Sequence, residues 1–414
     1  MITTTPIGYT AMAVAFANCF TSPAHSVTKL LFSRFSQPGP LRWLLAFGLC
    51  ATLALTDAWL RADPPPAPRG VWPAATAAAS GTLVLQSAGR IPMPTGAAAA
   101  HASNLLALPA GQPGALQVYW FAGSRESGPD VQIAMSQFDR ATQQWSPPVY
   151  VVNRHAAGGR LGYGLRRLGN PVAWRDAQGR VHLFVVATGL GGWAAGRILH
   201  LRQDAPEKPF EPQRVLPLSW LWNTSHLVRA MPLPLADGGM VLPAYFELGV
   251  KYPVALRFDA QGEFRGMVRM SRRGDLLQPT VLMRSETEWI ALMRDNRAAR
   301  QLRAAQTTDG GLHWQDLPDP GLPNPDSSIV GLSLLPGQMW MAHNPQPESR
   351  MQLALSRSSD GLHWTQVEML AQGGDRSEFS YPSMAWVDGS LWISYTEQRQ
   401  AIAWQRFIFL PAKP

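Results

Sequence analysis

Short runs in which apolar and polar side chains alternate recur along this chain. Clear examples are VQIAMSQF at residues 131–138 and MQLALSRS at residues 351–358. A period of two places the apolar side chains on one face of the backbone, which is typical of a half-buried β-strand. The pattern therefore predicts a protein built mainly from short strands.

The alternating runs lead into a recurring turn. TTDGGLHW at residues 307–314 and SSDGLHW at residues 358–364 are nearly the same phrase. In such a turn the Asp accepts hydrogen bonds from backbone amides, the Gly adopts a positive φ, and the aromatic ring packs back under the hairpin. Weaker copies place an Asp before an aromatic residue at Asp139 and Trp145, Asp204 and Phe210, and Asp259 and Phe264.

The spacing of these turns predicts the fold class. Counting Asp139, Asp204, Asp259, Asp309 and Asp360, successive copies lie 65, 55, 50 and 51 residues apart. A unit of this length with several short strands indicates a β-propeller. The strand-rich stretch at residues 379–409 adds a sixth blade, and we expect GTLVLQS at residues 81–87 to close it, because closure leaves no free sheet edge.

The beginning of the chain differs from the rest. LRWLLAFGLCATLAL at residues 41–55 is uninterrupted and apolar, and Lys29, Arg34 and Arg42 precede it. We expect residues 1–40 to be a disordered extension, 41–60 a signal peptide or membrane anchor, 61–80 a Pro/Ala-rich linker and 81–414 the propeller. The protein would then be exported, to the periplasm or the outer cell face, and touch the membrane only through this segment. A buried helix of the domain is the alternative.

Composition limits the partners and cofactors. The net charge is +8, but the excess comes from scattered Arg without a Lys/Arg run or a nucleic-acid-binding motif, so we expect no nucleic-acid partner. Both cysteines, Cys19 and Cys50, precede the propeller, and no His/Asp or His/His pair has metal-ligand spacing. We therefore expect no metal, no cofactor, no disulfide in the propeller, and a monomer.

The turn unit, Ser/Thr-x-Asp-x-Gly-x-Thr-Trp, resembles the Asp-box of the BNR-repeat, sialidase-like proteins. The resemblance covers residues 96–409 and includes YWFAGSRESGPDVQI, LGNPVAWRD, LLQPTVLMRS and EFSYPSMAW. It implies an all-β, six-bladed propeller of the sialidase type. In this family a Tyr activated by a Glu is the nucleophile, an Asp is the acid/base, and three Arg bind the carboxylate of an acidic sugar.

Four residues match this pattern directly. The resemblance implies that Tyr381 is the nucleophile, that Arg294 and Arg350 are the second and third clamp arginines, and that Glu397 orients the first. The structural alternatives are a core tyrosine, surface arginines and an ion pair at the rim.

The chain departs from the family at the base and at the first arginine. Gln278 stands where the family has its Glu, and an amide cannot accept the tyrosine proton; Glu247 is our candidate substitute. By strand position His101 replaces the first arginine, so Arg90 in GRIP is expected not to bind substrate.

The acid region offers more than one candidate. SRESGPDVQI holds both Glu126 and Asp130, with Arg125 beside them as a further cation, and we favour Asp130 because it precedes the alternating strand. Trp193 and Trp222 are candidates for stacking on sugar faces, and packing in the core or in a hairpin is the alternative.

Three functions remain open from the sequence. The first is a sialidase-like exo-glycosidase that hydrolyses a terminal sialic, other nonulosonic or uronic acid. The second is a non-catalytic propeller that binds acidic glycans in envelope polysaccharide metabolism. The third is a lyase for uronate polymers.

Overall fold

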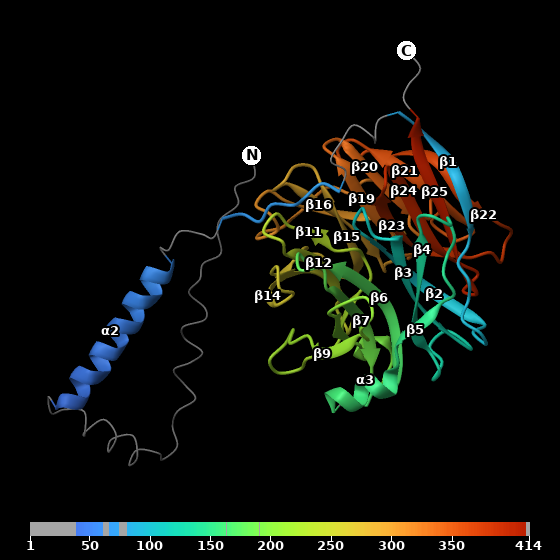
Figure 1. The fold of residues 1–414 in the computed structure, drawn as a ribbon. Helices are drawn as coiled ribbons and strands as arrows, with labels where there is room; N and C mark the ends of the chain where they lie inside the picture. The colour runs from blue at the N-terminus through green and yellow to red at the C-terminus, as the bar shows by residue number, and fades with distance from the viewer. Residues whose placement is uncertain (1–38, 61–65, 74–80, 163, 190, 411–414) are drawn as a thin grey trace, which may run out of the picture. The chain divides into compact units, whose positions relative to one another are not determined.

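The computed structural model describes residues 39–60, 66–73, 81–162, 164–189 and 191–410. The expected extension, residues 1–40, lies almost entirely outside this part of the chain. Within the described residues, those up to and including Pro66 and those from Ala67 onward belong to two separate compact units. The second unit is a six-bladed β-propeller, so the predicted fold class is confirmed (Figure 1).

Each blade is a sheet of four antiparallel strands that follow one another from the inner to the outer position, and blade 3 has one short extra strand. Blade 1 consists of β2 (Ala99–Ala107), β3 (Gly114–Gly123), β4 (Gln132–Asp139) and β5 (Val149–Val152). Blade 2 consists of β6 (Arg167–Arg175), β7 (Val181–Thr188), β8 (Arg197–Gln203) and β9 (Glu211–Val215). Blade 3 consists of β10 (His226–Val228), β12 (Met240–Phe246), β13 (Tyr252–Phe258) and β14 (Phe264–Arg269), and β11 (Leu233–Pro234) also pairs with β12.

The remaining blades follow the same order. Blade 4 consists of β15 (Leu276–Met283), β16 (Trp289–Asp295), β17 (Arg303–Thr307) and β18 (Gln315–Asp316). Blade 5 consists of β19 (Val330–Leu335), β20 (Gln338–His343), β21 (Gln352–Ser358) and β22 (Thr365–Gln372). Blade 6 consists of β23 (Phe379–Val387), β24 (Ser390–Glu397), β25 (Ala401–Leu410) and β1 (Thr82–Arg90). Two short helices, α3 (Arg154–Leu161) and η2 (Trp193–Ala195), lie in loops.

The closure of the ring explains why five Asp-boxes serve six blades. Every box lies in the turn between the third and fourth strands of blades 1 to 5. In blade 6 the fourth strand is β1, which comes from the N-terminal side and pairs with β25 from Thr82↔Leu410 to Arg90↔Ala403 (Figure 1). The expected closing strand is confirmed, and it extends three residues beyond Ser87.

The two strong Asp-boxes have the expected turn geometry. The carboxylate of Asp360 accepts hydrogen bonds from the amides of Leu362 and His363, both at 2.9 Å. The indole of Trp364 donates to the carbonyl of Gly361 at 3.0 Å, and Gly361 has a φ of 77°. Among the weak copies, Asp139 and Asp259 accept hydrogen bonds from turn amides, whereas the carboxylate of Asp204 bonds to the Arg202 side chain instead.

The core lies between blades rather than at the centre of the ring. Six clusters of buried apolar side chains fill the seams between neighbouring sheets. Trp120 of blade 1 and Trp392 of blade 6 share one seam, and Trp289 of blade 4 packs towards blade 3. Apolar burial in these seams therefore holds the blades together.

The compact unit begins before the first strand. Residues 67–73, which lie inside the expected linker, pack against blades 3 and 4. The amide of Val71 donates to the carbonyl of Pro234 at 3.0 Å, and the amide of Gly70 donates to the carbonyl of Glu286 at 2.7 Å.

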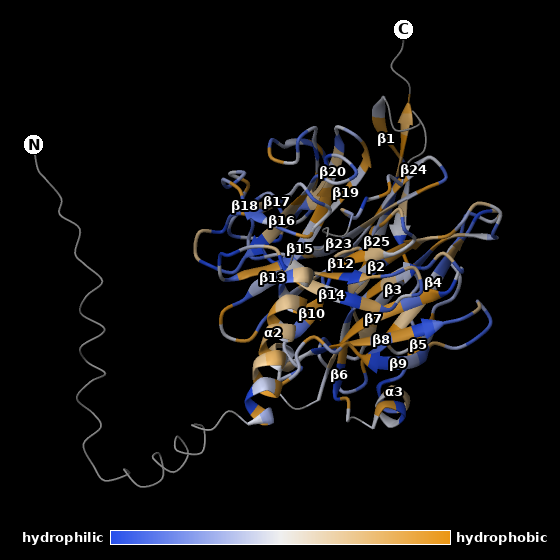
Figure 2. Ribbon diagram, turned by 90° about the vertical axis from the view of Figure 1, so that its left-hand side faces the viewer, coloured by the Kyte–Doolittle hydropathy of each residue, from blue (hydrophilic) through white to orange (hydrophobic). Residues whose placement is uncertain are grey.

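The N-terminal unit contains one described helix, α2 (Pro40–Leu60). Residues 40–58 are long and apolar enough to cross a membrane, and hydrophobic colours cover much of this helix in Figure 2. A signal sequence meets the same criteria, so the helix fits both forms of the prediction for residues 41–60.

Candidate active site

The inner strands share a local irregularity that aims side chains at one end of the central channel. Tyr381, Gln278 and Asn170 have φ values of 52°, 48° and 39°. Each lies at a bulge in its inner strand and is followed by a proline, which has no amide proton to contribute to a strand ladder. Ala102 of blade 1 lies at a similar bulge without a proline after it, whereas the positive-φ residues Ser225 and Asp326 precede the inner strands of blades 3 and 5.

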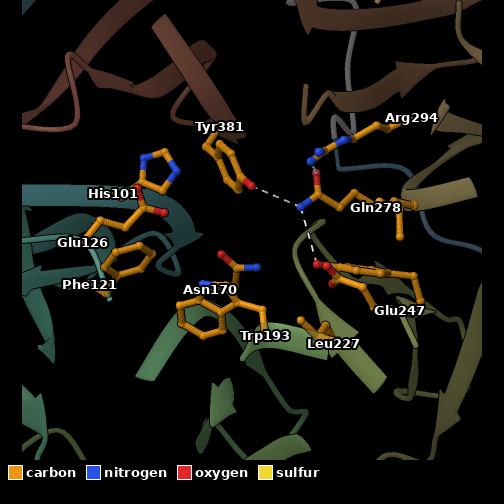
Figure 3. Close-up of a pocket in the computed structure, with 12 residues that line it drawn as sticks. His101, Phe121, Glu126, Asn170, Trp193, Leu227, Glu247, Gln278, Arg294 and Tyr381 are labelled. Carbon is orange, nitrogen blue, oxygen red and sulfur yellow. Dashed lines mark hydrogen bonds between the residues drawn. The ribbon is translucent and has the colours of Figure 1, made fainter. Parts of the chain in front are cut away.

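These bulges line a pocket at the mouth of the channel. Twelve residues from blades 1 to 4 and 6 line it: His101, Phe121, Glu126, Asn170, Trp193, Leu227, Tyr245, Glu247, Leu277, Gln278, Arg294 and Tyr381. In Figure 3, Glu126 lies across the cavity from Gln278 and Glu247, and Tyr381 lies on the wall between them. Non-glycine residues with positive φ are strained, and such strain concentrates at functional sites.

A hydrogen-bonded chain joins Arg294, Gln278 and Tyr381. Arg294 donates from Nη1 to the Gln278 side-chain oxygen at 3.0 Å. A guanidinium can only donate, so the amide oxygen must face Arg294 and the amide nitrogen must face the phenols. That nitrogen lies 3.4 Å from the hydroxyl oxygens of both Tyr381 and Tyr245 (Figure 3). Gln278 therefore presents donors to the candidate nucleophile.

Arginines and carboxylates alternate around the mouth. Arg294 pairs with Asp326, while Arg350 bonds to the Asp326 backbone carbonyl and pairs with Glu378 at 3.0 Å. Arg399, in the turn between β24 and β25, pairs with Glu378 at 2.8 Å. Arg399 also contacts Glu126, a lining residue. The mouth thus gathers three guanidinium groups close to the pocket.

The surroundings shift the pKa values of several groups here. Burial raises the pKa of the Glu247 carboxyl above its usual range, although Arg294 opposes the shift. Glu378 is partly desolvated, but its pKa falls to about 2 because Arg399 and Arg350 favour the carboxylate. Burial, followed by the charge of Arg399, lowers the pKa of His101 to about 3, so this imidazole is neutral at physiological pH.

Five of the nine site residues expected from the sequence line the pocket: Tyr381, Gln278, Glu247, Arg294 and His101. Arg350 is next to them through its contacts with Asp326 and Glu378. Arg125, Asp130 and Glu397 are not lining residues.

The contacts of two of these three explain their positions. The Asp130 carboxylate accepts hydrogen bonds from the Ser124 amide and hydroxyl at 2.6 and 2.9 Å, which lower its pKa. Glu397 pairs with the exposed Arg90 at 2.6 Å, the rim ion pair that was its structural alternative.

Sequence reasoning missed Arg399, Glu378 and Asp326, and gave Asn170 no role. A signal for Asn170 is present in the chain: the dipeptides Asn170-Pro171, Gln278-Pro279 and Tyr381-Pro382 each stand in an inner strand. Arg399 carries no such mark, because it reaches the mouth from a turn at the end of blade 6. Trp193 lines the pocket against Gly169, where a Cβ would lie 2.7 Å from the indole, whereas Trp222 is exposed outside it.

No group of three His, Cys, Asp or Glu side chains among the described residues has a geometry that would hold a metal ion. The polar side chains that line the pocket carry phenol, amide, imidazole, indole, guanidinium and carboxylate groups.

The blade order and the mouth together define a six-bladed propeller of the sialidase type. The chain belongs to the BNR repeat-like domain family, whose match spans residues 114–393. The predicted family is thereby confirmed.

Solved structures show the same fold at low sequence identity. The Hadza microbial sialidase Hz136 aligns with a TM-score of 0.62 and 17% identity over 74% of this chain and 65% of that one. A protein of unknown function from Dyadobacter fermentans aligns at 0.61 and 12% over 79% of this chain and 99% of that one. Trypanosoma rangeli sialidase in complex with the inhibitor DANA aligns at 0.61 and 11% over 78% of this chain and 60% of that one.

The chain thus spans less than two thirds of the length of those two sialidases. No curated protein matches it.

Proposed function

We propose that this protein is an exo-glycosidase that removes a terminal acidic sugar, a sialic or related nonulosonic or uronic acid, from a glycan outside the cytoplasm. The observation that carries the proposal is the phenol of Tyr381 on the pocket wall between Glu126 on one side and Gln278, which Arg294 contacts, on the other (Figure 3). A carboxylate nucleophile would be repelled by an acidic sugar, whereas a neutral phenol is not. The apolar helix α2 supports export, as a signal or an anchor.

The substrate carboxylate would bind to the arginines at the mouth. Arg294, Arg350 and Arg399 present planar guanidinium groups, which suit bidentate contacts with a carboxylate. Each already has a protein carboxylate as a partner, so Asp326 and Glu378 hold the cations in place before the sugar arrives. In this proposal Arg399 takes the place of the first clamp arginine, and the neutral His101 packs against the Tyr381 ring, with centroids 4.2 Å apart.

The reaction would proceed in two steps. The oxygen of Tyr381 attacks the anomeric carbon while its proton passes to Glu247, and the leaving oxygen takes a proton from an acid on the opposite wall. Water then attacks the anomeric carbon and breaks its bond to the Tyr381 oxygen; the acid group accepts the water proton, and Glu247 returns its proton to the phenol oxygen. Burial raises the pKa of Glu247, which brings this carboxyl closer to the range of an effective general base.

Two residues compete for the acid. Glu126 lines the pocket, and its contact with Arg399 fixes it there. Asp130, which the sequence favoured, is not a lining residue, and its carboxylate is turned to Ser124, which donates two hydrogen bonds to it. We therefore propose Glu126 as the acid.

One observation favours a second candidate function, binding without hydrolysis. Gln278 presents its amide nitrogen, a donor, to both Tyr381 and Tyr245, and an amide is no proton acceptor. If Glu247 does not take the proton, the same pocket would retain an acidic glycan without cleaving it.

The test uses the purified chain from residue 67 onward, with fluorogenic aryl sialosides and aryl uronides as substrates. Tyr381→Phe is the first variant, because it removes one oxygen and leaves the arginines intact. We expect wild-type turnover of one acidic series and loss of at least about 10³-fold in kcat for Tyr381→Phe, with affinity for the free sugar acid changed only a few-fold.

Each outcome has a distinct meaning. Turnover that survives in Tyr381→Phe would remove Tyr381 from the mechanism. Calorimetric binding of the sugar acid without any turnover would favour the binding function. Neither turnover nor binding across both series would overturn the acidic-sugar assignment.

A further inference from the structure

Arg229 is a buried cation next to Tyr381, although it does not itself line the pocket. It follows β10 in blade 3, and only 2% of its surface is exposed. Its guanidinium donates from Nη2 to the carbonyl of Pro382 in blade 6 at 2.8 Å and from Nη1 to the carbonyl of Ser103 in blade 1 at 3.2 Å. The side chain therefore crosses the central channel and links three blades.

The charge of Arg229 has no carboxylate partner. No ion pair involves it among the residues that the structure describes, and its Nε has no hydrogen-bond acceptor there. Burial lowers the pKa of Arg229 to about 10, while Tyr381 and Tyr245 act in the opposite direction. The guanidinium stays protonated at neutral pH, and an unpaired buried charge is costly to a fold.

The candidate nucleophile is the group that faces this charge. The Arg229 guanidinium carbon lies 5.1 Å from the centroid of the Tyr381 ring. Its bond to Pro382 also fixes the residue that follows Tyr381, at the bulge where Tyr381 has a positive φ. Arg229 thus acts on both the position and the electrostatic environment of the phenol.

The other groups around Tyr381 do not supply a comparable charge. Arg294 is paired with Asp326, and Arg350 and Arg399 are paired with Glu378. His101 is neutral, and Gln278 contributes only a dipole. The titratable and charged groups facing Tyr381 from neighbouring elements are His101, Arg229, Tyr245, Glu247, Arg294 and, farther out, Glu126, Arg350, Glu378 and Arg399.

We propose that Arg229 is a positioning residue whose uncompensated charge stabilises the phenolate that Tyr381 forms when it loses its proton. Where Gln278 replaces a base, such stabilisation offsets part of the cost of deprotonation. A fixed cation in a water-poor site needs no rearrangement when the negative charge develops, which makes it more effective than solvent. The catalytic part of this inference rests on the proposed function, but the ionisation of Tyr381 does not.

The first experiment measures that ionisation without any substrate. The tyrosinate absorbance near 295 nm is followed against pH, and the difference between each protein and its Tyr381→Phe counterpart isolates Tyr381. We expect the midpoint to move upward by at least about one pH unit in Arg229→Met and to stay within about half a unit in Arg229→Lys, which keeps the charge.

Controls separate this effect from loss of structure. Arg406→Met removes another guanidinium that stacks on an aromatic ring, 5.1 Å from the Trp392 centroid and away from the pocket, and should leave the Tyr381 midpoint unchanged. If Arg229→Met does not fold, as judged by circular dichroism, Arg229→Gln replaces it, because Gln is uncharged but keeps an N–H donor. An unchanged midpoint in a folded, uncharged variant overturns the inference.

The second experiment applies once wild-type turnover of an aryl glycoside is established. We expect Arg229→Met to lower kcat about 100-fold with KM changed less than about threefold, and Arg229→Lys to recover at least a tenth of kcat. A variant in which KM alone rises would show a role in binding and contradict our inference. Absence of wild-type turnover would count against the proposed function only, because the absorbance experiment stands by itself.

Discussion

The side-chain nitrogen of Gln278 lies 3.4 Å from the hydroxyl oxygen of Tyr381, and Arg294 fixes that orientation by occupying the amide oxygen. The tyrosine thus faces a hydrogen-bond donor, at the position where the family resemblance implies a proton acceptor. In the function we propose, deprotonation of Tyr381 therefore depends on Glu247 as acceptor and on nearby positive charge.

Gln278→Glu should increase the rate. A glutamate of the same length can retain the contact with Arg294 and present its other oxygen to Tyr381 as a proton acceptor. We expect kcat for an aryl glycoside of the preferred acidic sugar to rise at least about tenfold, since general base catalysis typically contributes more than that. Steady-state kinetics at several pH values measure the change.

Gln278→Asn is the matched control, because it keeps an amide but shortens the side chain. It should show no gain in kcat. If Gln278→Glu is folded and binds the sugar acid but is no faster than wild type, Gln278 does not occupy the position of the base.

Arg294→Met should weaken the binding of acidic ligands selectively. Loss of this guanidinium removes a charge-assisted contact with the sugar carboxylate, so we expect Kd for the free acid to rise about 100-fold. Kd for the methyl ester of the same sugar should change less than about threefold. Calorimetry with both ligands measures this difference.

Removal of Arg294 leaves the Asp326 carboxylate without its ion-pair partner. The double variant Arg294→Met/Asp326→Asn relieves that charge, and the same selectivity is expected in it. Arg273→Met, in the separate pair with Asp319, controls for the loss of a cation elsewhere. Equal losses for the acid and the ester would contradict a role for Arg294 as a carboxylate ligand.

The propeller fold could be predicted from the sequence because the same Asp-box turn recurs from blade to blade. Asp309 and Asp360 each mark a turn through bonds within a few residues, so five of the six blades could be counted from such turns. The closing strand was also predictable, because a sixth sheet without its own box needs an outer strand from elsewhere.

The residues of the candidate site could be predicted only in part, because the site depends on contacts between segments that are distant in the sequence. Tyr381 and Gln278 could be found from family phrases, but Arg399 reaches Glu126 across 273 residues of sequence. Arg229 bonds only to backbone carbonyls of blades 1 and 6, and backbone acceptors leave no mark in a sequence. Asp130 and Glu126 are four residues apart, and only the loop conformation shows which of them faces the pocket.

The helix α2 should retain the full chain at a membrane if it is an anchor. We expect the full-length protein to sediment with membranes and resist extraction by alkaline carbonate, while the chain from residue 67 onward is recovered in the soluble fraction. An apolar span of this length favours stable insertion unless it is removed. Mass spectrometry of the mature N-terminus provides the check, because a start beyond residue 58 would identify a cleaved signal instead.

Glu378 should make the stability of the propeller depend on acid. Its pKa is held at about 2 in the fold by Arg399 and Arg350, against about 4.3 for an ordinary Glu. A depressed pKa adds stability that is fully present above about pH 4.3 and is lost as the pH falls towards 2. Glu378→Gln should therefore lower the free energy of unfolding by ~2 kcal/mol at pH 7, and the difference from wild type should shrink by about 1 kcal/mol at pH 3.5.

Urea unfolding at the two pH values measures both quantities, and Glu368→Gln, at an exposed position on β22, should show neither effect. A Glu378→Gln deficit that is the same at both pH values would mean that packing, rather than the ion pairs with Arg350 and Arg399, accounts for the contribution of this residue.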